Sequence, residues 1–162
     1  ELLLEVGADV DAAKTDDGHV AVIETLIAAG ADVNKATTDD DTTPLFMAAQ
    51  EGHTSTVEKL IAAGADVNKA KTTDGVTPLF MAAQNGHTST VEKQIAAGAD
   101  VDKATTTNGS TPLWIAAQSG HPAIVSKLLQ HGADTSIRGW HDETPLEAAQ
   151  RNNHAAVTTL LA

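Results

Sequence analysis

The sequence contains no cysteine. This absence excludes a disulfide scaffold, a zinc site with cysteine ligands and a thiol nucleophile, and on this ground we expect an intracellular, cytoplasmic protein. No uninterrupted hydrophobic run exceeds five residues, whereas a membrane-spanning helix needs about 20.

Basic residues are scarce, with 10 Lys and Arg against 22 Asp and Glu and a net charge of -12. Such a chain repels phosphate backbones and anionic membranes, so we expect neither nucleic acid nor a membrane as a partner.

Aromatic residues are nearly absent as well. Phe46, Phe80, Trp114 and Trp140 are the whole set, while alanine occurs 29 times and hydrophobic residues still make up 41% of the chain. A single core of this size normally draws more volume from large rings. The composition therefore favours thin layers packed closely through alanine, as in stacked repeats.

The sequence repeats itself at a regular period. Thr-Pro-Leu begins at Thr43, Thr77, Thr111 and Thr144, in steps of 34, 34 and 33. Residues 43–70 and 77–104 agree at 25 of 28 positions. Self-similarity at this period predicts a stack of identical structural units.

Each unit has the pattern of two short helices followed by a loop. In the unit that begins at Thr77, the threonine can cap the first helix and Pro78 fits its first position. Gly86 is placed to end this helix, and Gly98 to end the second one. Asp74-Gly75 and Asn108-Gly109 predict two-residue hairpin tips in the loops between units.

These motifs closely resemble ankyrin repeats. Residues 77–87, Thr-Pro-Leu-Phe-Met-Ala-Ala-Gln-Asn-Gly-His, followed by Gly98-Ala99-Asp100-Val101, are similar to the family pattern almost letter for letter. The resemblance implies an all-α solenoid of helix-turn-helix units joined by projecting β-hairpin loops, with a concave face lined by hairpins and first helices. We expect one array over 1–162: a partial repeat at 1–11, an incomplete one at 12–34, full repeats at 35–68, 69–102 and 103–136, and a C-terminal capping-like repeat at 137–162.

The first units are irregular. Gly-Ala-Asp recurs at Gly7 and Gly30, a step of 23, whereas each of its later steps is 34. The part that is missing corresponds to 76–86 of the regular unit, a whole first helix. We favour a segment missing between Gly18 and His19 over a true deletion, which would uncover the facing side of the next unit. Because the pattern opens inside a second helix and stops at one, we also expect the chain to be part of a longer array.

Two departures from the family pattern concern the core. The position that the family usually gives to histidine holds Phe46, Phe80, Trp114 and then Glu147. We favour packing between units over a binding stripe for these rings, with Glu147 ending the row at a polar C-terminal cap. Gln94 replaces the leucine of the other units, so we expect its amide to reach a backbone group or solvent.

The sequence offers no catalytic constellation. His19, His53, His87, His121 and His154 share one repeat position, with helix layers about 8 to 10 Å apart, whereas ligands of one zinc ion lie within about 2.1 Å of it. We interpret these histidines as structural residues of the turn between helices. Asp39-Asp40-Asp41 lacks the alternate spacing and distal glutamate of a calcium loop. We therefore expect no enzyme, no metal, no cofactor and no small-molecule substrate.

The family resemblance implies a non-enzymatic interaction module or scaffold, and we expect a monomer that binds a protein partner through the concave face and hairpin tips. Trp140 is the strongest candidate anchor, with packing against the last unit as the alternative. The candidate contact residues are Asp39, Asp40, Thr42, Gln50, Glu51, Thr73, Asp74, Val76, Gln84, Asn85, Thr107, Asn108, Ser110, Gln118, Ser119, Trp140, His141 and Glu143.

Two other interpretations remain open. The near identity of two units is also typical of a structural spacer within a larger protein, and of an engineered or consensus-like scaffold. Charge is uneven: residues 1–81 hold 15 acids and 5 bases, and residues 82–162 hold 7 and 5. Solubility explains this imbalance, and attraction of a basic partner to the N-terminal half is the alternative.

Overall fold

The computed structural model describes residues 16–38 and 41–162, with side chains from Val20 onward. Within this part the chain forms α-helices, one 3-10 turn and no strand. The α-helices are α2 (Asp16–Ala28), α3 (Pro44–Glu51), α4 (Thr54–Ala62), α5 (Pro78–Gln84), α6 (Thr88–Ala96), α7 (Pro112–Ser119), α8 (Pro122–Gln130), α9 (Pro145–Arg151) and α10 (Ala155–Leu161), and the 3-10 turn is η2 (Trp140–Asp142).

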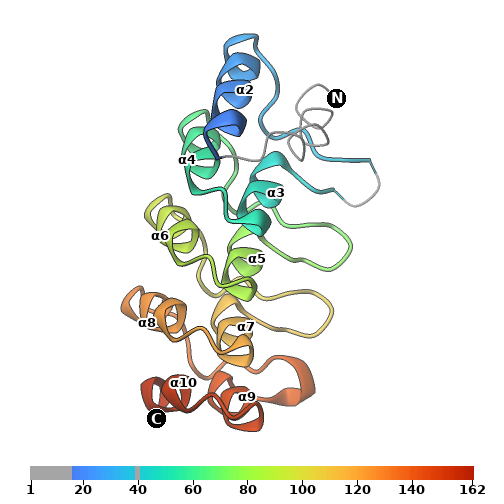
Figure 1. The fold of residues 1–162 in the computed structure, drawn as a ribbon. Helices are drawn as coiled ribbons and strands as arrows, with labels where there is room; N and C mark the ends of the chain where they lie inside the picture. Colours follow the sequence, from blue (N-terminus) through green and yellow to red (C-terminus); the bar gives the residue numbers. More distant parts are fainter. Residues whose placement is uncertain (1–15, 39–40) are drawn as a thin grey trace.

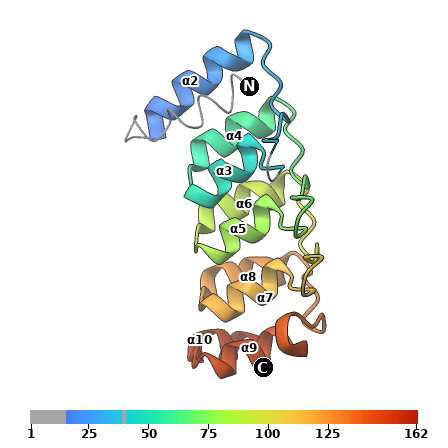
Figure 2. The ribbon, with the colours of Figure 1, turned by 90° about the vertical axis from the view of Figure 1, so that its right-hand side faces the viewer.

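The helices form two parallel columns. First helices α3, α5, α7 and α9 stack on one another, and second helices α2, α4, α6, α8 and α10 form the other column (Figure 1). The loops between units project from the side of the first helices, and they gather along one edge of the array (Figure 2). The predicted helical solenoid is confirmed.

The Thr-Pro-Leu motif starts each first helix in the predicted way. The hydroxyl of Thr77 accepts a hydrogen bond from the backbone N–H of Phe80 at 3.1 Å, and Pro78 occupies the first turn. The cap satisfies a donor that the helix itself leaves unpaired, and proline loses nothing there because its position has no partner within the helix. Gly86 then takes a left-handed conformation with φ of 82°.

The core runs along the interface of the two columns. The stripe Leu79, Ala82 and Ala83 is at most 1% exposed, and Val91 of α6 packs against it with no exposed surface. The small alanine side chains let the helices approach closely, in keeping with the few aromatic residues.

The first unit differs from the sequence-based expectation. Helix α2 runs without a break through Gly18 and His19, so these two residues are consecutive and the predicted missing segment is wrong. The unit contributes one helix of 13 residues to the second column and no first helix within residues 16–38. His19 therefore lies inside helix α2 and not at a turn between two helices.

The loop tips also differ from two-residue hairpins. The N–H of Lys71 donates to the carbonyl of Val76 at 2.9 Å, and Thr105 and Ser110 make the matching bond at 3.0 Å. Each closure encloses four residues. Gly75 and Gly109 supply the left-handed residue of the tip, with φ of 74° and 73°, so the Asp-Gly and Asn-Gly pairs mark the turns but do not constitute them.

Candidate interaction face

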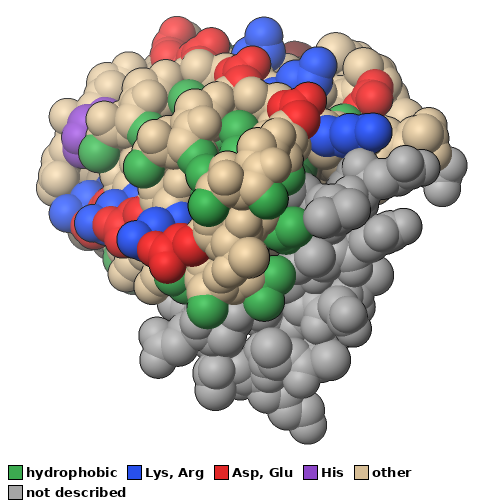
Figure 3. Space-filling view, turned by 90° about the horizontal axis from the view of Figure 1, so that it is seen from above, with side chains coloured by type: hydrophobic (Ala, Val, Ile, Leu, Met, Phe, Trp, Pro, Cys, Tyr) green, Lys and Arg blue, Asp and Glu red, His purple; other side chains and the backbone are tan. Residues whose placement is uncertain are grey.

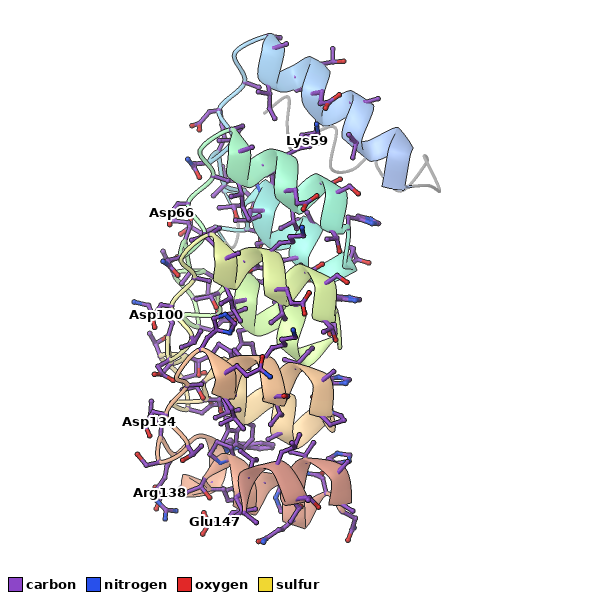
Figure 4. The ribbon with its side chains drawn as sticks, turned by 90° about the vertical axis from the view of Figure 1, so that its left-hand side faces the viewer. Lys59, Asp66, Asp100, Asp134, Arg138 and Glu147 are labelled. Carbon is purple, nitrogen blue, oxygen red and sulfur yellow. The ribbon has the colours of Figure 1, made fainter. Side chains whose placement is uncertain are left out.

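Polar side chains at the exit of each second helix join neighbouring units. Asn68 accepts a hydrogen bond from the backbone N–H of Asp100 at 2.8 Å and donates one to the carbonyl of Gly98 at 3.2 Å. Asn34 makes the same pair of bonds one unit earlier. Asp66, Asp100 and Asp134 lie one below another along this edge (Figure 4). Asp66 and Asp100 also accept a hydrogen bond from the backbone N–H two residues further on, at 2.9 and 3.1 Å, so these acidic side chains hold their turns together, as expected for a structural motif.

Asp102 holds the position of Asn34 and Asn68, but it has a carboxylate oxygen where they have an amide nitrogen. Its carboxylate accepts from the N–H of Asp134 at 2.9 Å, in the way that Asn68 accepts from Asp100. A carboxylate has no N–H group to offer, so the carbonyl of Gly132 lacks the bond that Gly98 receives.

The repeated histidines tie each unit to the one before it. Nε2 of His87 lies 2.9 Å from the carbonyl oxygen of Gln50, and His154 makes the same contact with Gln118. The ring lies against the glycine that ends the preceding first helix: a Cβ atom on Gly120 would come within 2.5 Å of the His154 ring. This arrangement supports the structural interpretation of these histidines, and it explains why glycine recurs at the end of the preceding first helix: Gly52, Gly86 and Gly120 each face a histidine ring of the next unit.

Ion pairs form a row along the second helices, which the sequence analysis missed. Lys59 pairs with Glu24 at 2.6 Å, Lys93 with Glu58, and Lys127 with Glu92 at 2.8 Å. In Figure 3 basic and acidic side chains alternate in one band of the surface. The Glu-Lys dipeptides at 58–59 and 92–93 were the available signal. Each ion pair joins a glutamate to the lysine that lies one repeat unit and one residue further along the chain, as Glu58 and Lys93 do.

The pKa values follow from these pairs. The hydrogen bond and charge of Glu24 raise the pKa of Lys59, and Glu58 raises that of Lys93 in the same way. Lys127 lowers the pKa of Glu92. All of these groups are exposed, so the row contributes little to stability and mainly keeps this face charged.

The three aromatic rings of the repeated position lie in the core. Phe46, Phe80 and Trp114 are 4%, 8% and 2% exposed. Rings this deeply buried pack between units and are not open to a partner, which agrees with the favoured interpretation. The Trp114 indole also donates to the backbone carbonyl of Glu143 at 2.9 Å.

Gln94 does not behave as predicted. Its side chain has no exposed surface, and neither amide atom has a hydrogen-bond partner in the described part of the chain. Leu60 and Leu128, which hold the same position in α4 and α8, are equally buried. The position is a core site built for leucine, so the amide reaches neither backbone nor solvent.

Most predicted contact residues lie on the side of the first helices and loops, which we call the loop face. Eight of them are exposed: Glu51, Thr73, Gln84, Asn85, Thr107, Asn108, Trp140 and His141. Six are partly buried: Gln50, Asp74, Val76, Gln118, Ser119 and Glu143. Asp39 and Asp40 lie outside the described residues.

The prediction of a partner contact is wrong for two residues. Thr42 and Ser110 are 5% and 1% exposed, because the residue before Thr-Pro-Leu turns inward at the base of the loop. The Ser110 hydroxyl accepts a hydrogen bond from the N–H of Trp140 at 3.2 Å. Both residues close their loops and cannot reach a partner.

Ion pairs cap the C-terminal unit. Glu147, which stands where the other units have a ring, accepts from the N–H and hydroxyl of Thr144 and pairs with Arg138 at 3.2 Å. The bonds from Thr144 and the charge of Arg138 lower the pKa of the Glu147 carboxyl. Arg151 donates through Nε to both carboxylate oxygens of Glu143, at 2.9 and 3.0 Å. Charged side chains thus take the place of the aromatic row in this unit.

No cluster of three or more His, Cys, Asp or Glu residues that could hold a metal ion occurs within residues 16–38 and 41–162. Among the helices described, none is long and apolar enough to cross a membrane.

A comparison with protein families gives the context of this architecture. The model of the family described as ankyrin repeats (3 copies) matches residues 10–105 and 79–162. None of the curated proteins compared with the chain matches it. Ankyrin repeats generally mediate protein–protein interactions and are typically not enzymes. The match covers nearly the whole sequence and agrees with the paired helices and projecting loops: this chain belongs to the ankyrin repeat family.

Proposed function

We propose that this chain is a non-enzymatic interaction module that binds a protein partner through the loop face. The observation that carries the proposal is how the side chains divide between packing and exposure. Residues that cap, pack or join units recur from one unit to the next, as in the Thr77 cap and the His87 contact. The last position of the first-helix segment varies instead: it holds the exposed Glu51 and Asn85 and the partly buried Ser119. Variation on a constant scaffold is typical of a recognition surface.

The geometry of the array supports this use. Hydrogen bonds between adjacent units fix the loops relative to one another; for example, the N–H of Thr106 donates to the carbonyl of Asp74 at 2.8 Å. A partner therefore meets a surface whose elements are already in place, and binding costs little conformational entropy.

A structural spacer is the second candidate. Its support is the near identity of residues 43–70 and 77–104, together with the repeated bonds that would keep such a spacer stiff. A spacer needs no specific surface, so loss of the exposed loop-face side chains would change nothing in its binding.

The two candidates separate in a capture experiment. The full chain and a loop-face variant, Gln84→Ala with Gln118→Ala, serve as baits in a cell lysate, and captured proteins are identified by mass spectrometry. A matched control replaces Ser89 and Gln130 with alanine on the second helices. We expect a partner whose purified form binds the wild type and the control equally and binds the loop-face variant at least tenfold more weakly. Recovery of the same proteins by all three baits would favour the spacer.

A further inference from the structure

The last loop is built differently from the others. The step from Thr111 to Thr144 is one position shorter than the two steps before it, and this loop closes with a bond from the N–H of Gly139 to the carbonyl of Glu143 at 2.9 Å. Three residues remain in the tip, where the loops at 71–76 and 105–110 hold four. The deleted residue tightens the tip into the 3-10 turn η2.

The shorter tip places two successive non-glycine residues in the left-handed region. His141 and Asp142 have φ of 63° and 57°. Asp142 stands where Gly75 and Gly109 take the same conformation, but His141 is an addition that neither of those two loops has. Side chains disfavour this conformation, so the tip stores strain that the rest of the loop has to offset.

The base of the loop supplies that support. The N–H of Trp140 donates to the Ser110 hydroxyl, and the Arg138 guanidinium donates to the carbonyl of Asp142. Trp114 holds the carbonyl of Glu143 from below. Gly139 fits against Ser110 so closely that a Cβ atom would lie 2.7 Å from its Oγ. The tip is therefore fixed by its neighbours in spite of the strain.

This fixed tip displays an aromatic ring in solvent. Trp140 is 49% exposed, although the other three aromatic residues are at most 8% exposed. Its indole stacks on the His141 imidazole with ring centroids 4.3 Å apart and an angle of 24°. Asp142 is exposed in the same turn, and its carboxylate makes no hydrogen bond or ion pair with the residues that the structure describes. Packing within the chain explains neither the exposed ring nor the strain that presents it.

We propose that the Trp140 tip, made of Trp140, His141 and Asp142, binds an arginine side chain of a protein partner. This inference rests on the proposed function and adds the chemistry of the partner. A guanidinium group stacks on an indole face and pairs with a carboxylate, so the exposed ring and Asp142 offer both halves of its recognition. Glu147 and Glu143 of this unit are each paired with an arginine of the chain, so Asp142 is the carboxylate that the loop leaves open to a cationic partner.

Titration with a defined peptide tests the proposal. The probe is a synthetic eight-residue peptide of alternating glycine and arginine, and the readout is the two indole N–H signals in a ¹H–¹⁵N spectrum of the full chain. We expect saturable movement of the Trp140 signal. Trp140→Ala should weaken the peptide affinity about tenfold, and Trp140→Phe should recover part of this loss.

A charge-matched control separates the tip from general attraction to an acidic protein. Asp142→Asn and Asp74→Asn remove the same charge from different loops, and Asp142→Asn should weaken binding at least threefold more than Asp74→Asn does. The proposal is overturned by an absence of saturable binding up to 10 mM peptide, by equal binding of a glutamate peptide, or by an affinity of Trp140→Ala within twofold of the wild type. Circular dichroism of each variant verifies that it is folded.

Failure here and failure of the proposed function look different. If binding of a captured partner depends on Gln84 and Gln118 while the arginine peptide binds wild type and Trp140→Ala equally, the proposed interaction module is supported and the proposed arginine site is wrong. If the peptide binds at Trp140 but no captured partner depends on Gln84 and Gln118, the arginine site is supported. The chain then binds through its last loop and not through the first helices.

Discussion

Replacement of Gln94 by leucine should stabilise the protein strongly for a single substitution. The side chain has no exposed surface, and both amide atoms lack partners in the described structure. A buried polar group without a hydrogen bond costs about 1 to 3 kcal/mol, and a buried leucine adds favourable apolar contact. Glutamine and leucine have nearly the same helix propensity, so α6 itself is not affected.

The size of the gain can be estimated from neighbouring units. Leu60 and Leu128 occupy the same position with no exposed surface, so the site accepts leucine without a large rearrangement. Removal of the amide penalty alone predicts a gain of about 2 kcal/mol, the middle of the range of about 1 to 3 kcal/mol. For a chain of this length, that gain corresponds to about 4 to 8 °C in the melting temperature.

Urea unfolding followed by circular dichroism measures the change in the free energy of unfolding. The reverse substitution, Leu60→Gln, is the matched control and should destabilise by a similar amount. A Gln94→Leu protein with unchanged or lower stability would refute the reasoning, because it would mean that the amide is satisfied in solution. Binding at the loop face should be the same for the wild type and Gln94→Leu, since α6 belongs to the second column.

Three further predictions concern the joints between units. Asp102→Asn restores a donor for the carbonyl of Gly132 and should raise the free energy of unfolding by about 1 kcal/mol in the same assay; no gain would contradict the role of that bond. Gly120→Ala should cost more than about 1 kcal/mol, because its φ is 76° and the new Cβ would meet the His154 ring; a neutral effect in thermal melts would argue against this contact. The pKa of Glu147 is lowered on folding, so its contribution is complete above its ordinary pKa of 4.5 and is lost as the pH falls through the lower folded value; Glu147→Gln should therefore flatten this part of the stability–pH curve, and an unchanged curve would disprove the link.

The sequence predicts the local elements of this fold well because each depends on nearby residues. The Thr77 cap, Pro78 and the left-handed Gly86 follow from conformational preferences that act over a few positions, and the structure has all three as predicted. The repeat period then determines which faces must pack, so the buried stripe could also be predicted.

The errors arise where the outcome depends on a neighbouring unit. The burial of Ser110 follows from the loop that packs on it, and the isolation of Gln94 depends on the helices around it. The irregular start was misread for a related reason: the repeat period predicts a full unit, whereas helix α2 runs on through Gly18 and His19 and packs on α4 in the second column. The exposed tip at Trp140 was found from the residue type, whereas its strain depends on a deleted residue whose effect only the backbone reveals.

The contacts between units leave the number of units free to change. Asn68 binds the turn of the next unit, and His87 binds the first helix of the one before, so each contact spans a single step. Excision of residues 69–102 would bring Asn68 directly before Lys103, where its amide could bond to Asp134 as Asp102 does and also donate to the carbonyl of Gly132. Loss or duplication of one such segment would thus keep the contacts of Asn68 and of the repeated histidines matched. Chain length could change in whole units while each remaining unit keeps its fold.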